Sequence, residues 1–275
     1  MAGGLLQYSG ILAKTRAMHG RLLTREDFLH FTEIETVHET IAYLREQESY
    51  GRIYSGHDEI EHRGQAEAVI HNSIIRDYQS LYSFAGPMQR QELKLYEPQL
   101  QYGESVPELD ISYFSDVWKE LKQFKGVSRK VLTEIYGTQI DWLNIMWMYR
   151  AKRFFGQSPK EIHAMLIPVH YRLKTQEVEG LLMAEQMESF QKILAATAYF
   201  RGQEALIQMQ DEISYHQVMN RMYRKVCRKY PCSIAPVYRY LHEKELEIEH
   251  LTTAIEGIRY QIPAKDIRAL ILNIT

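Results

Sequence analysis

Residues 160–167 read KEIHAMLI and residues 265–272 read KDIRALIL, so one motif occurs twice, 105 residues apart. A proline stands just before each copy, at Pro159 and at Pro263, and a long stretch with helical periodicity precedes each proline. Because proline is tolerated in the first turn of a helix but not inside one, each copy predicts a long helix, a short turn and a short helix. The matching order indicates a duplicated unit. No third copy is visible in the first 110 residues.

The composition favours helices along the whole chain. The 275 residues include 15 glycines and 8 prolines, and proline is absent from residues 1–86, 108–158 and 169–230. Within these stretches apolar residues recur at helical spacing. One such stripe consists of Phe114, Val117, Trp118, Leu121 and Phe124. The sequence therefore predicts an all-α fold.

Two helix starts and one break can be read locally. Thr36 with Glu39 and Ser158 with Glu161 match the capping box, in which each side chain bonds the backbone of the other residue. The region from Gly86 to Pro107 is rich in proline, glycine and polar residues. It predicts a broken helix or a linker.

Several classes of function are disfavoured by what the sequence lacks. No apolar run approaches the roughly 20 residues of a membrane-spanning helix, and the amino terminus has the wrong charge order for a secretory signal, so we expect it to form the first helix. The two cysteines are too few for a disulfide framework and fit a reducing cytoplasm. Neither a glycine-rich phosphate loop nor a serine or cysteine nucleophile motif occurs, so we expect no cofactor, no direct nucleotide binding and no catalysis.

A metal-binding alternative rests on two Glu-x-x-His pairs, Glu59 with His62 and Glu247 with His250. Pairs of this kind on two helices are typical of helical di-iron proteins. Both pairs lie in stretches dense with other charges, which instead favours a solvated helix face.

Two further helices carry uncommon patterns. Residues 221–229 hold five cations and no acid, opposite an apolar face of Val218, Met219, Met222, Tyr223 and Val226. With a net charge of -2 and a pI near 6.6, the chain is not expected to bind nucleic acid, whereas an acidic protein partner for this stripe stays open. Residues 140–155 are apolar on two sides, which predicts a helix at the centre of the fold or one covered by a partner.

Many helix-forming motifs follow one another along the chain. The first half contributes Y-x-x-x-L-A-K-x-R-A-M at 8–18, L-L-T-x-x-D-F at 22–28, I-A-Y-L at 41–44 and F-x-x-x-W-x-x-L at 114–121. The second half contributes I-D-x-x-N-I-x-x-x-x-R-x-K at 140–152, L-I-P-V-x-Y-R-L at 166–173 and Y-L-x-x-K-E-x-E-I-x-x-L at 240–251. By the order and spacing of these motifs, rather than by any one of them, the chain resembles the C-subunit family of V/A-type rotary ATPases, whose eukaryotic member is called the d subunit.

The resemblance implies three similar helical units forming a pseudo-threefold funnel, with bounds 1–107, 108–173 and 174–275. The first unit departs from the family pattern where Pro98 interrupts it. It further implies a non-catalytic rotor subunit whose socket receives the central shaft and which caps the membrane ring of ion-carrying subunits, on the cytoplasmic, inner face of the membrane.

Polar residues of the family-like motifs are then the candidate partner contacts: Asp141, Asn144, Arg150, Glu245 and Glu249. For Asp141 and Asn144 hydrogen bonds inside the chain are an equal alternative.

Overall fold

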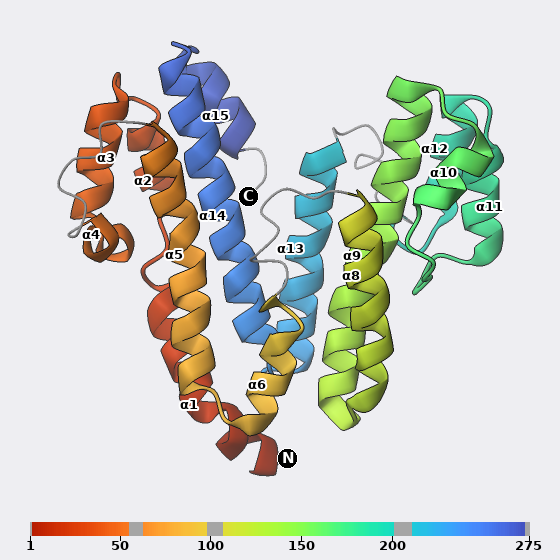
Figure 1. The fold of residues 1–275 in the computed structure, drawn as a ribbon, viewed down its shortest axis with the longest axis horizontal. Helices are drawn as coiled ribbons and strands as arrows, with labels where there is room; N and C mark the ends of the chain where they lie inside the picture. Colours follow the sequence, from red (N-terminus) through yellow and green to blue (C-terminus); the bar gives the residue numbers. More distant parts are fainter. Residues whose placement is uncertain (1, 55–62, 98–106, 201–210, 273–275) are drawn as a thin grey trace. The chain divides into compact units, whose positions relative to one another are not determined.

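The computed structural model describes residues 2–54, 63–97, 107–200 and 211–272, and in these ranges every regular element is a helix (Figure 1). The prediction of an all-α fold is confirmed. None of the described helices is both long and apolar enough to cross a membrane. The expected first helix is present as α1 (Ala2–His19).

The chain divides into two compact units, one of residues 1–93 and 236–275 and the other of residues 94–235. Unit 1 begins with α1 and continues with α2 (Arg25–Phe31), α3 (Val37–Glu46), α4 (Glu48–Tyr54), α5 (Arg63–Phe84), α6 (Pro87–Lys94), α14 (Ala235–Arg259) and α15 (Ala264–Leu272). Unit 2 holds α8 (Pro107–Glu120), the short 3-10 helix η1 (Leu121–Gln123), α9 (Gly126–Arg150), the π-helix η2 (Ala151–Phe155), α10 (Pro159–Met165), α11 (Thr175–Met183), α12 (Met187–Ala196) and α13 (Asp211–Lys229). The predicted bounds of three units stay a prediction.

The duplicated motif folds as expected. In each copy a long helix of 25 residues, α9 or α14, is followed by a short helix, α10 or α15. Ile162 and Ile267 occupy the same place in the motif and both are buried. Both copies also turn through a left-handed residue, Gly156 with a φ of 57° and Gln261 with a φ of 54°. These two residues are again separated by the spacing of the sequence repeat, so the turn is part of the duplicated unit.

The local helix signals give a mixed result. Ser158 and Glu161 form the predicted capping box, and Thr36 accepts a hydrogen bond from the Glu39 backbone. The apolar stripe that begins at Phe114 was predicted on one helix, but α8 ends at Glu120 and the stripe continues through η1. The predicted break holds α6 at its start, whereas residues 98–106, including Pro98, lie outside the described residues.

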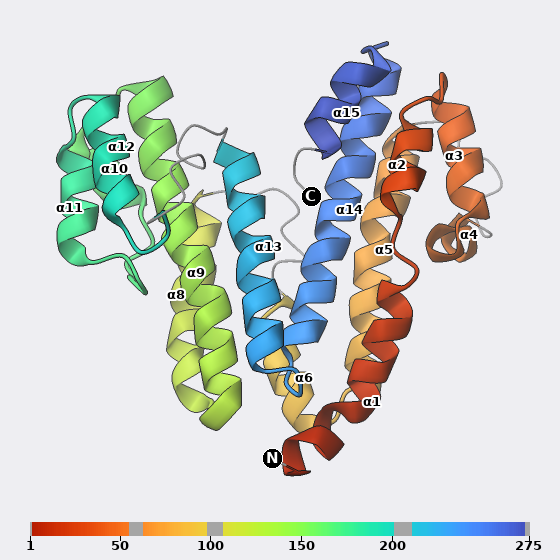
Figure 2. The same cartoon turned by 180° about the vertical axis from the view of Figure 1, so that it is seen from behind.

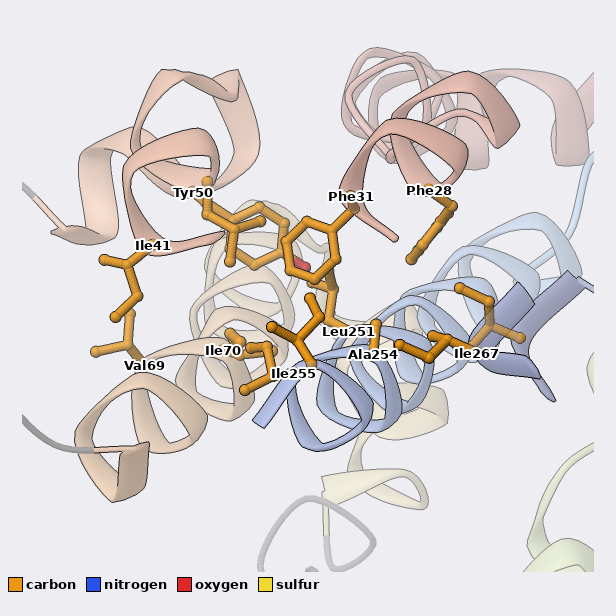
Figure 3. Close-up of a cluster of buried hydrophobic side chains, with 13 residues drawn as sticks. Phe28, Phe31, Ile41, Tyr50, Val69, Ile70, Leu251, Ala254, Ile255 and Ile267 are labelled. Atoms are coloured by element: carbon orange, nitrogen blue, oxygen red, sulfur yellow. The ribbon is translucent and has the colours of Figure 1, made fainter. Parts of the chain in front are cut away.

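The core of unit 1 joins both ends of the sequence. Figure 3 shows side chains from α2, α4, α5 and α14 converging, with Phe31 and Tyr50 near Leu251. The long helix α14 approaches α15 closely at Gly257, where an added Cβ would lie 2.7 Å from the Ile267 side chain. Amino-terminal helices therefore complete the packing of the carboxyl-terminal pair.

In unit 2 the long helix α9 is the central element. Both views of the ribbon show α8 beside α9, with α10, α11 and α12 grouped together around one end of it (Figures 1 and 2). Trp142, Ile145 and Met146 are buried, as expected for a helix at the centre of the fold. Phe154 and Phe155, which follow α9 in η2, are instead 64% and 73% exposed.

The two left-handed turns give a reciprocal test of the repeat. A side chain with a Cβ is disfavoured at positive φ by about 1 kcal/mol, and nothing lies within 4 Å of a Cβ placed on Gly156. We therefore expect Gly156→Ala to lower the free energy of unfolding by about 1 kcal/mol and Gln261→Gly to raise it by up to about 1 kcal/mol. Urea denaturation midpoints measure both. Changes of the same sign in the two variants would contradict a shared turn geometry.

Candidate functional site on the long helices

The Asp141 carboxylate fastens a distant segment of unit 2 to the middle of α9. It is fully buried and accepts hydrogen bonds from the backbone N–H groups of Tyr171, Arg172 and Leu173 at 3.0, 2.6 and 3.1 Å. The Tyr199 hydroxyl donates a fourth hydrogen bond at 2.7 Å. Burial and the neighbouring carboxylate raise the pKa of Tyr199 well above its usual value, so this phenol stays a donor. Asp141 thus holds both the segment that precedes α11 and the segment that follows α12.

Asn144 lies one turn further along α9 and holds the segment that follows α10. Its side-chain amide donates to the Ile167 carbonyl at 3.0 Å and accepts from the Ile167 N–H at 2.9 Å. Both predicted contact residues are therefore occupied by hydrogen bonds inside the chain, the alternative that the sequence left open. Their direct contact with a partner stays a prediction.

Glu247 plays the corresponding part in α14. Its carboxylate accepts from the Tyr50 hydroxyl at 2.7 Å and from the Leu23 backbone N–H, and it forms an ion pair with Lys244. Lys244 is only 1% exposed and also donates to the Tyr50 hydroxyl at 2.9 Å. Burial, followed by the charge of Glu247, raises the pKa of Tyr50 well above its usual value. The buried charge of Lys244 is therefore matched by Glu247 in a group where every member is hydrogen-bonded.

A common rule connects the two buried carboxylates. Asp141 binds three backbone N–H groups just before the start of α11, and Glu247 binds one just before the start of α2. Each also accepts a hydrogen bond from a tyrosine hydroxyl further along the same segment. The sequence carries a matching signal at the edges of two motifs quoted above, because residues 172–175 read RLKT and residues 21–24 read RLLT. The tyrosines that complete the sites, Tyr199 and Tyr50, follow at similar distances. The two segments are thus locally alike, and a third unit at the amino terminus stays a prediction.

The prediction of a solvated face around Glu247 is wrong on one side of α14. Lys244, Glu247 and His250 are all buried, because this side packs against the amino-terminal helices. The ring of His250 meets Phe28 edge to face at 5.5 Å between centroids. Charge density in the sequence did not distinguish the buried side of the helix from the exposed one.

The di-iron alternative is not supported. No group of three or more histidine, cysteine, aspartate or glutamate side chains that could hold a metal is found among the residues that the structure describes. The Glu247 carboxylate is already bonded to Lys244 and Tyr50. Glu59 and His62 lie outside the described residues.

The other three predicted contact residues are accessible. Arg150 is half-buried at the last position of α9, and Glu249 is exposed on α14. Glu245 is partly exposed and lies 4.0 Å from the His242 ring nitrogen. Among the five predicted residues, these three are the ones whose side chains a partner can reach.

Unit 1 also contains a polar cavity of about 740 Å³ between α1, α5 and α14. Lys14, Arg21, Arg76 and Asp77 are among its lining residues, and the Tyr240 hydroxyl donates to Asp77 at 2.5 Å. Burial raises the pKa of the Asp77 carboxyl. The cavity has no glycine-rich loop of the kind that binds nucleotide phosphates.

The fold and the site define an all-α protein built on two duplicated long helices, with buried polar groups that hold neighbouring segments and with charges at its surface. Residues 11–101 and 107–270 match the family model described as ATP synthase (C/AC39) subunit. The match covers most of the chain, and the chain belongs to this family. The resemblance seen in the sequence is confirmed at this level.

Named relatives are the C subunits of A-type ATP synthases from archaea. The chain is 25% identical over 179 residues to that of Archaeoglobus fulgidus, covering 62% of this chain and 51% of the relative. It is 29% identical over 167 residues to that of Pyrococcus horikoshii, covering 58% and 44%. With that of Methanosarcina mazei it is 21% identical over 282 residues, covering 92% and 75%. The chain spans about half the length of the first two of these relatives.

Removing the Asp141 carboxylate tests how much it contributes to the free energy of unfolding. In Asp141→Ala, three backbone donors and one hydroxyl lose their acceptor in a buried site, so the free energy of unfolding is expected to fall by roughly 3 kcal/mol or more. The matched control is Asp116→Ala, which breaks an exposed ion pair with Lys119 and is expected to cost less than about 1 kcal/mol. Equal shifts of the two urea denaturation midpoints would contradict this assignment.

A pH dependence is expected from His19 and Glu243, which lie 2.8 Å apart in unit 1. The hydrogen bond that His19 donates to Glu243 raises the pKa of His19 above 6.5, so the stabilisation is complete below pH 6.5 and is lost as pH rises through the folded-state pKa. Burial acts to raise the pKa of Glu243, but hydrogen bonds from His19 and Arg239 outweigh it and lower the pKa below 4.5. Stability from Glu243 is therefore present above pH 4.5 and lost as pH falls through its folded-state pKa.

The wild type should thus exceed His19→Gln in melting temperature at pH 6 and lose most of this advantage by pH 9. Because His19 is about half exposed, the difference corresponds to about a few tenths of a kcal/mol. The exposed His38 provides the control, as His38→Gln. A pH dependence that is the same for both variants would show that the His19–Glu243 pair contributes nothing.

Proposed function

We propose that this chain is a non-catalytic central-stalk subunit of a V/A-type rotary ATPase. In this role it forms a socket that links the central shaft to the membrane ring and transmits torque between ATP turnover and proton or sodium transport. The observation that carries the proposal is the family match over nearly the whole chain. The named archaeal relatives, each the C subunit of an A-type ATP synthase, give it further support.

The proposal includes an arrangement and a place. Three helical units, 1–107, 108–173 and 174–275, surround a pseudo-threefold axis as a funnel. The duplicated long helices α9 and α14, and the likeness between residues 21–24 and residues 172–175, support this arrangement. The chain lies on the cytoplasmic face of the membrane, held there by its partners. It binds neither nucleic acid nor nucleotide directly.

The coupling contacts divide into two groups. Arg150, Glu245 and Glu249 contact the shaft directly, because their side chains reach the surface from the two long helices. Asp141 and Asn144 contribute through the segments that they hold in place. Polar contacts suit a protein that joins the shaft reversibly during assembly, since large exposed apolar patches favour aggregation of the free chain.

Charge reversal tests whether these residues couple the shaft to the ring. The variant combines Arg150→Glu, Glu245→Lys and Glu249→Lys, which places like charges opposite the shaft at a cost on the order of several kcal/mol. Two activities are measured: ATP hydrolysis by the detached catalytic head, and ion pumping by the whole complex assembled with the variant. We expect hydrolysis to be retained and pumping to be lost.

A matched control reverses the same number and kind of charges at exposed positions of unit 2, as Arg129→Glu, Glu179→Lys and Glu188→Lys. The control should pump like the wild type. Normal pumping by the Arg150 variant would show that these three residues are not the coupling surface. Failure of the wild-type chain to join a rotary complex at all would refute the proposed function itself.

A further inference from the structure

The strongest charge feature outside the sites above is the exposed face of α13. Five cations, Arg221, Arg224, Lys225, Arg228 and Lys229, are all exposed, and no acid occurs from residue 213 to residue 229. The opposite face is buried as predicted, with Val218, Met222 and Val226 among its core residues. Such a charge density is unusual in a chain whose net charge is only -2.

Ordinary structural roles account for two of the five cations. Lys225 lies 3.7 Å from the buried Glu134 carboxylate, so it has a partner within unit 2. Lys229 lies over the Tyr230 ring in the last turn of the helix, where a positive charge interacts favourably with the helix dipole. The dipole effect fades beyond the last turn and does not account for Arg221 or Arg224.

Three arginines remain and form one row. Arg221, Arg224 and Arg228 follow the i, i+3, i+7 spacing, which places them on one side of the helix over about 10 Å. In the part of the chain that the structure describes, none of these guanidinium groups is paired with a carboxylate; Arg228 donates only to the Arg224 carbonyl, at 3.3 Å. In α14, the next helix in the sequence, Glu243 and Glu247 are bonded to Arg239 and Lys244 instead.

We propose that this row of arginines docks a helix of the rotor shaft that presents carboxylates at matching spacing, an inference that rests on the proposed function. Arginine suits this role because its planar guanidinium forms two parallel hydrogen bonds with one carboxylate. Two turns of a partner helix cover the same length as the row, so carboxylates at i, i+4 and i+7 can each meet one arginine.

The surroundings of the row favour a protein partner over a membrane or a nucleic acid. A helix that lies on a lipid surface inserts apolar side chains there, but the apolar face of α13 is buried and its exposed face carries no large apolar residue between 215 and 229. Nucleic acid binding relies on an extended basic surface, whereas the chain as a whole is slightly acidic.

The test measures binding of the full chain to its cognate shaft subunits, purified separately. The variant Arg221→Glu, Arg224→Glu, Arg228→Glu should raise the dissociation constant about 100-fold or more. Replacing the same three residues by lysine keeps the charge but loses the paired hydrogen bonds, so a rise of about 10-fold is expected. Wild-type affinity should also fall as NaCl is raised from about 50 to 300 mM, because added salt screens exposed charges.

The control Lys122→Glu, Arg129→Glu, Lys130→Glu removes the same charge from exposed positions elsewhere in unit 2 and should bind like the wild type. Circular dichroism confirms that each variant folds. Equal binding by the α13 variant and the control would overturn the inference while leaving the proposed function standing. The inference would also be overturned if the α13 variant kept its affinity for the shaft but lost binding to phosphatidylglycerol vesicles or to duplex DNA. No binding of the wild-type chain to the shaft would refute both.

Discussion

The structure depends on carboxylates buried in the middle of its long helices. Removing an ionised carboxylate from water costs several kcal/mol unless donors replace the lost hydration. Asp141 recovers this cost from three backbone N–H groups and a tyrosine, which can reach it only if residues 171–173 and Tyr199 take one arrangement. The hydrophobic effect is non-directional, so it brings the helices together without fixing the path of the segments between them. The hydrogen bonds to the carboxylate determine that path.

The same constraint explains how unit 1 is completed. In unit 2 the segment bound by the carboxylate follows the long helix directly in the sequence, since α11 comes after α9 and α10. In unit 1 the segment bound by Glu247 instead comes from far earlier in the sequence than the long helix, at Leu23 and Tyr50. Arg268 on α15 reinforces this closure by bonding Thr32 and Glu33 at the end of α2. The hydrogen bonds of Glu247, which correspond to those of Asp141 in unit 2, therefore join α14 to the amino-terminal helices.

Local signals predicted the elements of this fold, and non-local pairing determined the rest. The helices, the Ser158 cap and the repeat follow from the order of neighbouring residues, so they could be predicted from the sequence. The burial of Lys244 and Glu247 could not, because a run of charges indicates solvent unless its partners are known, and those partners lie some 200 residues away in the sequence. The same holds for Asp141: its motif was visible in the sequence, but hydrogen bonding inside the chain was only one of two alternatives for its side chain.

If the proposed function holds, this division of roles limits which residues can contact other subunits. A buried charged group whose hydrogen bonds are all made inside the chain has none available for a partner. Exposing it would break the hydrogen bonds that hold its neighbouring segments in place. Force can pass to such residues only through the helices that carry them. Under the proposed function, direct contacts therefore come from accessible charges, such as those on α9, α13 and α14. Because the fastenings lie on two of these same helices, displacement of a surface contact would be transmitted to the segments that Asp141 and Glu247 hold.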